Sequence, residues 1–187
     1  MPKFTTRLLS AVTLLLFIQI AALAEERRFP TLGRVVSDAE VRGWDIAIGP
    51  NGEELPIGAG SVDQGAAVYA VQCAYCHGAK GNEGPDHKLV GGTGTLDTTK
   101  PVQTIGSYWP FATTVFDYIN RAMPFLTPGS LSVDEVYAVT AFLLYQNGII
   151  DRQFVISNEN LAAIEMPNRN GFIADPRPEK LTEGGSP

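Results

Sequence analysis

The chain has 187 residues, 44% of them hydrophobic and 18% charged, which is the balance of an ordinary globular protein. Its formal net charge of −6 at pH 7 makes nucleic acid a poor candidate partner and favours a partner with a basic docking surface. The length suffices for one domain with a hydrophobic core of its own.

The first 24 residues have the pattern of a secretory signal peptide. Lys3 and Arg7 give it a positive start, residues 14–18 an apolar centre, and residues 22–24 a small-x-small cleavage site. Cleavage after Ala24 takes the formal net charge from −6 to −8, because it removes two cations and no acid. The apolar centre is short for a membrane span and no later stretch offers a second one. We therefore expect a periplasmic protein with no membrane span after cleavage; an uncleaved anchor is the alternative.

Residues 25–60 predict an irregular N-terminal arm, because glycine–proline and asparagine–glycine turn signals interrupt any long period. One short helix fits residues 37–44, since Ser37 followed by Glu40 forms a capping box. We expect the arm to pack on the domain through three apolar anchors: Trp44, Ile46 and Ile48.

The first longer helix is predicted to begin after Ser61, whose side chain forms a capping box with Gln64. It runs directly into Cys73-Ala74-Tyr75-Cys76-His77, two cysteines three positions apart with a histidine after the second. That spacing is the attachment signature of a c-type haem. The two thiols add to the vinyl groups of one porphyrin, and the adjacent histidine then lies beneath the iron.

Three other interpretations of Cys73, Cys76 and His77 compete with this one. A disulfide oxidoreductase has the same cysteine spacing but needs a preceding strand and a thioredoxin-type sheet. Zinc needs more nearby ligands than His77 and His87 supply, and a simple disulfide leaves the adjacent histidine unexplained. We therefore predict one covalently bound haem c, held by Cys73 and Cys76, with His77 as the proximal iron ligand.

A glycine-rich segment follows at residues 78–106. It lacks the preceding strand and the Gly-Lys-Ser/Thr sequence of a phosphate-binding loop, so we interpret it as a tight loop near the proximal haem face. A proximal histidine usually donates its second ring N–H to a carbonyl. The predicted acceptor for His77 is the carbonyl of Pro85.

Two further helices are predicted. Pro110 suits the first position of a helix that ends at Met123, because proline lacks the N–H that is unpaired there anyway. Ser132 and Glu135 form a third capping box, and the helix that they begin ends at Gly148, a typical residue just beyond a helix terminus.

The sixth iron ligand is predicted to be a methionine, whose sulfur raises the reduction potential and suits electron transfer. Met123, on a loop between two predicted helices, is our first choice and Met166 the alternative; either residue has core filling as its other role. His87 follows the proximal histidine by ten residues and is poorly placed for the opposite haem face. Tyr108 and Trp109 are candidates for the haem propionates and haem edge, and equally for plain core aromatics.

Four segments carry a resemblance more specific than the haem motif. They are similar to the cytochrome subunits that pair with molybdenum sulfite dehydrogenases, including the sulfur dehydrogenase of thiosulfate-oxidising systems. The segments are Gly-Ser-Tyr-Trp-Pro at 106–110, Phe-Asp-Tyr-Ile-Asn-Arg-Ala-Met-Pro-Phe at 116–125, residues 130–141, and Met-Pro-Asn-Arg-Asn-Gly-Phe at 166–172. The haem motif and the Met123-Pro124 segment before a final helix also resemble class I cytochromes c.

The resemblance implies an all-α class I cytochrome c fold, with helices packed round one haem, over residues 61–148. The irregular arm at 25–60 precedes this domain. A C-terminal extension at 149–175 carries enough apolar side chains to pack against it. Residues 176–187 are polar or rich in glycine and proline, and are expected to be disordered.

The resemblance also implies a function. The chain is expected to be an electron-transfer protein with no substrate site of its own. It would accept electrons from the catalytic subunit of a molybdenum sulfite dehydrogenase and pass them to a downstream cytochrome or oxidase of the respiratory chain. One alternative is a shuttle for another periplasmic dehydrogenase. Another is a haem sensor or small haem peroxidase, which needs an open or exchangeable sixth position at the iron.

Overall fold

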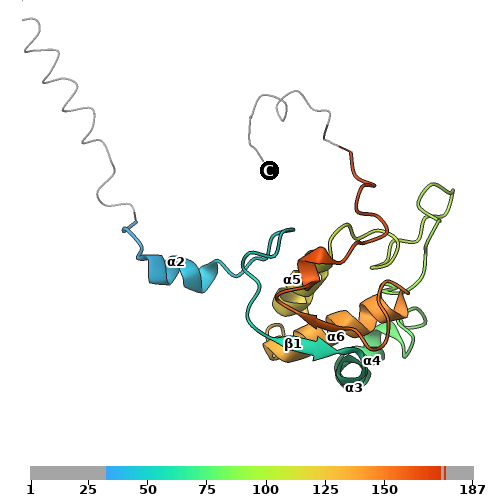
Figure 1. Ribbon diagram of the computed structural model, residues 1–187, viewed down its shortest axis with the longest axis horizontal. Coiled ribbons are helices and arrows are strands. Elements are labelled where there is room, and N and C mark those ends of the chain that lie inside the picture. Colours follow the sequence, from blue (N-terminus) through green and yellow to red (C-terminus); the bar gives the residue numbers. More distant parts are fainter. Residues whose placement is uncertain (1–32, 174, 176–187) are drawn as a thin grey trace, which may run out of the picture. The chain divides into compact units, whose positions relative to one another are not determined.

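The computed structural model describes residues 33–173 and 175. The chain divides into two units, Met1–Asp45 and Ile46–Pro187, and each is described by its own described residues. The described part of the first unit carries one short helix, α2 (Asp38–Trp44). The second unit is mostly helical, as the sequence predicts (Figure 1). Its elements are β1 (Ala59–Ser61), α3 (Val62–Gln72), α4 (Ala74–His77), α5 (Ala112–Ala122), α6 (Val133–Gln146), β2 (Val155–Ser157) and the 3-10 helix η1 (Leu161–Ala163).

Three helices begin with the capping boxes that the sequence predicts. In each, a serine hydroxyl accepts a hydrogen bond from the backbone N–H three residues on, and the side chain there accepts from the serine N–H. The pairs are Ser37–Glu40 in α2, Ser61–Gln64 in α3 and Ser132–Glu135 in α6.

Helices α3 and α6 cross at very short range. A Cβ atom added to Gly65 of α3 would lie 1.8 Å from the Ala138 carbonyl oxygen of α6, so only glycine fits there. One turn further along α3, the rings of Tyr69 and Phe142 pack with centroids 4.9 Å apart. This crossing fixes the direction in which α3 reaches the haem motif.

Helix α5 completes the core, with the Phe116 and Tyr137 rings 4.4 Å apart between α5 and α6. It begins two residues later than the sequence predicts, because Phe111 is extended and serves as the N-cap, which leaves Pro110 outside the helix. The guanidinium carbon of Arg169 lies over the Phe111 ring, 4.4 Å from the ring centroid. Helix α6 ends where the sequence predicts: its C-cap is Asn147, and Gly148 follows with a φ of 69°.

Strands β1 and β2, which the sequence does not predict, pair antiparallel with Gly60 opposite Ile156 (Figure 1). Gly60 also packs against α6, since an added Cβ would lie 2.1 Å from the Ala138 backbone nitrogen. The C-terminal extension contributes four buried apolar side chains to the core, one from β2 and three from beyond it: Ile156, Leu161, Ile164 and Met166.

Of the three apolar anchors expected in the N-terminal arm, Ile48 is buried, whereas Trp44 and Ile46 are exposed. The Ile48 N–H donates a 2.9 Å hydrogen bond to the buried carboxylate of Asp117, which also pairs with Arg121. The expected signal peptide and disordered tail lie outside the described residues. In the described part of the chain, every helix is too short or too polar to span a membrane.

Candidate haem-binding site

Helix α3 delivers the two cysteines on one turn. The Cys73 N–H donates to the Tyr69 carbonyl at 2.9 Å and so continues α3, and the His77 N–H donates to the Cys73 carbonyl at 3.1 Å and so closes α4. The Tyr69 hydroxyl adds a 3.0 Å hydrogen bond to the Gly78 carbonyl. Cys73 is the cap residue between α3 and α4, and Cys76 lies three positions further on, within α4. Both thiols are free and partly exposed.

The thiol acidities argue against disulfide exchange. Burial raises the pKa of Cys73 to about 11, with a smaller contribution from Cys76. A hydrogen bond to the Asp86 carboxylate raises the pKa of Cys76, and burial adds to the effect. Reactive thiols of disulfide oxidoreductases have lowered pKa values instead. The helix before Cys73 likewise differs from the strand that a thioredoxin-type site requires.

His77 is held in one tautomer by the loop that follows it. Its Nδ1 lies 2.8 Å from the His87 carbonyl oxygen, and because a carbonyl only accepts, Nδ1 carries the proton. With the Nδ1 proton held there, Nε2 is the ring nitrogen left to bind a metal. This is the geometry of a proximal haem ligand.

The acceptor is therefore His87, and the prediction of Pro85 is wrong. Two hydrogen bonds attach the loop to α4, from the Gly84 N–H to the His77 carbonyl at 3.3 Å and from the Asp86 N–H to the Cys76 carbonyl at 3.0 Å. They bring the next carbonyl, that of His87, opposite the imidazole. The His87 side chain itself is exposed.

The tight loop expected here is present. A Cβ atom on Gly84 would lie 2.1 Å from the Cys76 carbonyl oxygen, so backbone packs directly on backbone beneath the motif.

Asn147, which the sequence analysis does not single out, fixes this loop to α6. Its side-chain NH₂ group donates to the Leu89 carbonyl at 3.1 Å and to the Leu143 carbonyl at 2.8 Å, and its Oδ1 accepts from the Gly91 N–H at 3.1 Å. An asparagine directly before a terminating glycine is the signal that could have drawn attention to it.

The two candidate methionines lie in different environments. Met123 is the C-cap of α5 and is half-buried at the edge of the core. Met166 is 1% exposed and enclosed by core side chains. The side chain of Met123 is thus the more accessible of the two.

Tyr108 and Trp109 are half-buried before α5. Among residues 33–173 and 175, neither the Tyr108 hydroxyl nor the Trp109 indole N–H makes a hydrogen bond to another described residue. The Trp109 ring meets Tyr118 edge-on, with centroids 5.7 Å apart.

The segment 166–172 contacts Tyr108 and Phe111, two aromatic residues that precede α5. Asn168 donates to the Tyr108 carbonyl at 2.7 Å, and the Phe172 ring meets the Tyr108 ring edge-on at 5.2 Å. Together with the contact of Arg169 on Phe111, this places the segment over the entry to α5. The segment is thus a support for Tyr108 and Phe111.

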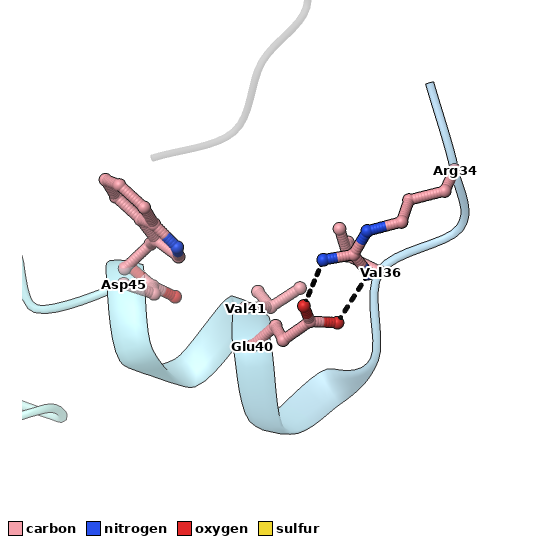
Figure 2. Close-up of a pocket in the computed structure, with 6 residues that line it drawn as sticks. Arg34, Val36, Glu40, Val41 and Asp45 are labelled. Carbon is pink, nitrogen blue, oxygen red and sulfur yellow. Dashed lines mark hydrogen bonds and ion pairs between the residues drawn. The ribbon is translucent and has the colours of Figure 1, made fainter. Parts of the chain in front are cut away.

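The donor set fits a covalent haem. It comprises two thiols on one turn, an imidazole with Nε2 free, and a half-buried methionine sulfur at the end of α5. Among the described residues, no three His, Cys, Asp or Glu side chains gather as a metal-binding group, so the zinc alternative has no ligand cluster there. The hollow drawn in Figure 2 belongs to α2 and contains none of the haem-motif residues.

A helical domain with this turn and this histidine is a c-type cytochrome. Residues 60–143 match the family described as cytochrome C oxidase, cbb3-type, subunit III. A chain of the crystal structure of the sulfane dehydrogenase SoxCD from Paracoccus pantotrophus is 44% identical, with a TM-score of 0.73; the match covers 84% of this chain and 79% of that one. No curated protein matches the sequence. The chain belongs to the class I c-type cytochromes that resemble the cytochrome subunit of molybdenum sulfite dehydrogenases.

Membership of this family establishes the coarse function and confirms the resemblance inferred from the sequence. The chain is an electron-transfer protein, and its family carries a covalently bound haem c.

Proposed function

We propose that this chain is a periplasmic monohaem cytochrome that accepts single electrons from the catalytic subunit of a molybdenum sulfite dehydrogenase and passes them to the respiratory chain. The observation that carries the proposal is the 44% identity to a chain of the sulfane dehydrogenase SoxCD over most of both chains. The partner, the number of haems and the location are part of the proposal.

We propose Cys73 and Cys76 as the attachment points, His77 as the proximal ligand and Met123 as the distal ligand. When bound, the haem supplies a one-electron iron couple. The hydrogen bond from His77 to the His87 carbonyl orients the ring. Half-burial at the end of α5 supports Met123 over Met166. The half-buried position of Tyr108 and Trp109 before α5 supports a role at the haem propionates.

The test is stopped-flow reduction of the purified holoprotein by the molybdenum subunit with sulfite, and separately with a sulfane sulfur substrate. Fast reduction by either substrate supports the proposal. Negligible reduction at low salt with both substrates contradicts the partner, while the assignment as a cytochrome stands. Mass spectrometry of the periplasmic fraction tests export, cleavage before Glu25 and the mass of one haem.

The competing functions make a different prediction for the sixth position. A haem sensor or peroxidase requires an open or exchangeable site, so its ferrous form binds carbon monoxide rapidly. A methionine-ligated electron carrier shows the near-infrared charge-transfer band of methionine–iron ligation and resists carbon monoxide. Rapid binding would favour the sensor or peroxidase.

A further inference from the structure

The carbonyl that accepts from the imidazole of the haem motif lies in a loop anchored on both sides of His87. Before His87, the Asp86 N–H attaches the loop to the motif itself, at the Cys76 carbonyl 3.0 Å away. After His87, the Leu89 N–H donates to the Gly81 carbonyl at 2.7 Å, and Gly81 belongs to the same loop. Neither of these two bonds connects the loop to the long helices of the core.

Asn147, at the end of α6, makes such a connection with both ends of its side-chain amide. The NH₂ group donates to the Leu89 carbonyl at 3.1 Å, and Oδ1 accepts from the Gly91 N–H at 3.1 Å. These partners are 58 and 56 residues away in the sequence. The other amide proton goes to the Leu143 carbonyl at 2.8 Å, within α6. One side chain therefore uses both its protons and its oxygen to join the loop to the helix.

The Asn147 amide has close neighbours on its other side. A Cβ atom added to Gly106 would lie 2.3 Å from Asn147 Oδ1, so the backbone of residue 106 packs directly on the amide. The Ile105 N–H donates to the same Leu89 carbonyl at 3.2 Å. That carbonyl accepts two hydrogen bonds, which is the capacity of its two lone pairs. The position of Leu89, two residues after His87, is thus fixed from outside the loop.

We propose that Asn147 is a positioning residue for the proximal imidazole. By fixing Leu89 to α6 it holds the His87 carbonyl opposite Nδ1 of His77, and so sets the strength of that 2.8 Å hydrogen bond. Hydrogen bonds to an axial ligand are one of the means by which a protein sets the reduction potential of its haem. Asn147 thus acts on the potential without being a ligand. This inference rests on His77 as the proximal ligand, which is part of the proposed function.

The plainer interpretation of Asn147 is a cap of α6, and it makes a different prediction. Asn147 is the C-cap residue, and its bond to the Leu143 carbonyl satisfies one of the carbonyls left unpaired at a helix end. Loss of a cap lowers stability and leaves the potential unchanged. Loss of a positioning residue changes the potential and the imidazole proton as well.

The experiment measures the reduction potential of the purified holoprotein, and the proton NMR signal of the His77 Nδ1–H in the ferrous state. Asn147→Ala should raise the potential, because a weaker hydrogen bond leaves less electron density on the ring to stabilise ferric iron. The Nδ1 proton should exchange with solvent about fivefold faster, the factor equivalent to one net hydrogen bond of about 1 kcal/mol.

Two further variants separate positioning from stability. Gly106→Ala should act in the same direction as Asn147→Ala, because its Cβ atom displaces the Asn147 amide without changing the amide itself. Val136→Ala is the matched control, since Val136 is completely buried near the other end of α6. It should lower the midpoint of urea unfolding by removing core packing, with the potential and the Nδ1 exchange at their wild-type values.

Three outcomes overturn the inference and leave the proposed function in place. The first is a folded Asn147→Ala variant whose potential does not rise or whose Nδ1 proton exchanges no faster. The second is an equal shift of the potential in Val136→Ala, which would mean general loosening. The third is loss of folding or of haem in both Asn147→Ala and Gly106→Ala, which would make Asn147 a structural residue only. If the wild-type spectrum shows no iron-bound His77, the proximal assignment fails and this inference with it.

Discussion

Met123 and Met166 each precede a proline, yet one caps α5 at the edge of the core and the other is enclosed within it. We expect Met123→Ala to abolish the near-infrared methionine–iron band. Met166→Ala should keep the band and lower the free energy of unfolding by about 2–5 kcal/mol, the usual cost of truncating a buried methionine. The control Met166→Leu preserves volume and should lose less than about 1.5 kcal/mol. Loss of the band in Met166→Ala alone would reverse the ligand assignment.

Asp117 gives the stability of the second unit a dependence on pH. Burial alone would raise the pKa of its carboxyl, but hydrogen bonds from Arg121 and the Ile48 N–H outweigh burial and lower it. A lowered pKa in the folded state stabilises the fold above the unfolded value of about 3.9, and this contribution is lost as pH falls through the folded pKa.

We therefore expect Asp117→Asn to lower the free energy of unfolding by about 1–2 kcal/mol at pH 7, with the difference from wild type narrowing as the pH falls below the unfolded value of about 3.9. Urea denaturation at pH 7, 5 and 2 measures this difference. Asp63→Asn is the control, because the pair of Asp63 with Arg152 is exposed and should change stability by less than about 1 kcal/mol. A difference in Asp117→Asn that does not narrow between pH 5 and pH 2 would contradict an origin in the charge.

At the scale of single residues, the sequence predicts a haem site at Cys73, Cys76 and His77, because covalent attachment to one ring requires that spacing. The assignment itself stays a prediction. The acceptor for His77 was not predictable, because it depends on how two loop hydrogen bonds place the His87 carbonyl.

At the scale of elements, the close crossing of α3 and α6 requires that residue 65 have no Cβ atom. Gly65→Ala would place Cβ 1.8 Å from the Ala138 carbonyl oxygen. We expect it to lower the free energy of unfolding by about 1–3 kcal/mol, although alanine favours an isolated helix by about 1 kcal/mol. Thermal denaturation measures the change. Gly43→Ala in α2 is the matched control, because an added Cβ there meets no atom within 4 Å and should cost nothing. Equal effects in both variants would rule out close packing as the cause.

The three capped helices were predictable because each capping box lies within four consecutive residues. Strands β1 and β2 were not, since three residues show no periodicity and the two partners lie nearly a hundred residues apart. The sequence predicts that α5 starts at Pro110, because proline in general suits the first position of a helix. Phe111 remains extended in this fold, and the helix begins after it.

At the scale of the whole molecule, charge should govern how fast the partner is met. Loss of the expected signal peptide leaves a formal net charge of −8, two units more negative than the full chain at −6. We expect the second-order rate of reduction by the molybdenum subunit to fall several-fold between about 10 mM and 300 mM salt, because the Debye length shrinks from about 30 Å to below 8 Å. Reduction by an uncharged chemical reductant is the control. A rate independent of salt would contradict electrostatic docking.

The pairing of β1 with β2 also bears on the order in which haem attachment and folding take place. We expect an exported polypeptide to emerge from its N-terminus, so that the thiols of Cys73 and Cys76 emerge before Val155–Ser157. The ladder, like the α3–α6 crossing, joins segments far apart in the sequence, and contacts of that kind form slowly. During this interval the cysteine turn lies on an open chain, within reach of whatever attaches a haem. We expect attachment to come first and closure of the ladder to follow it.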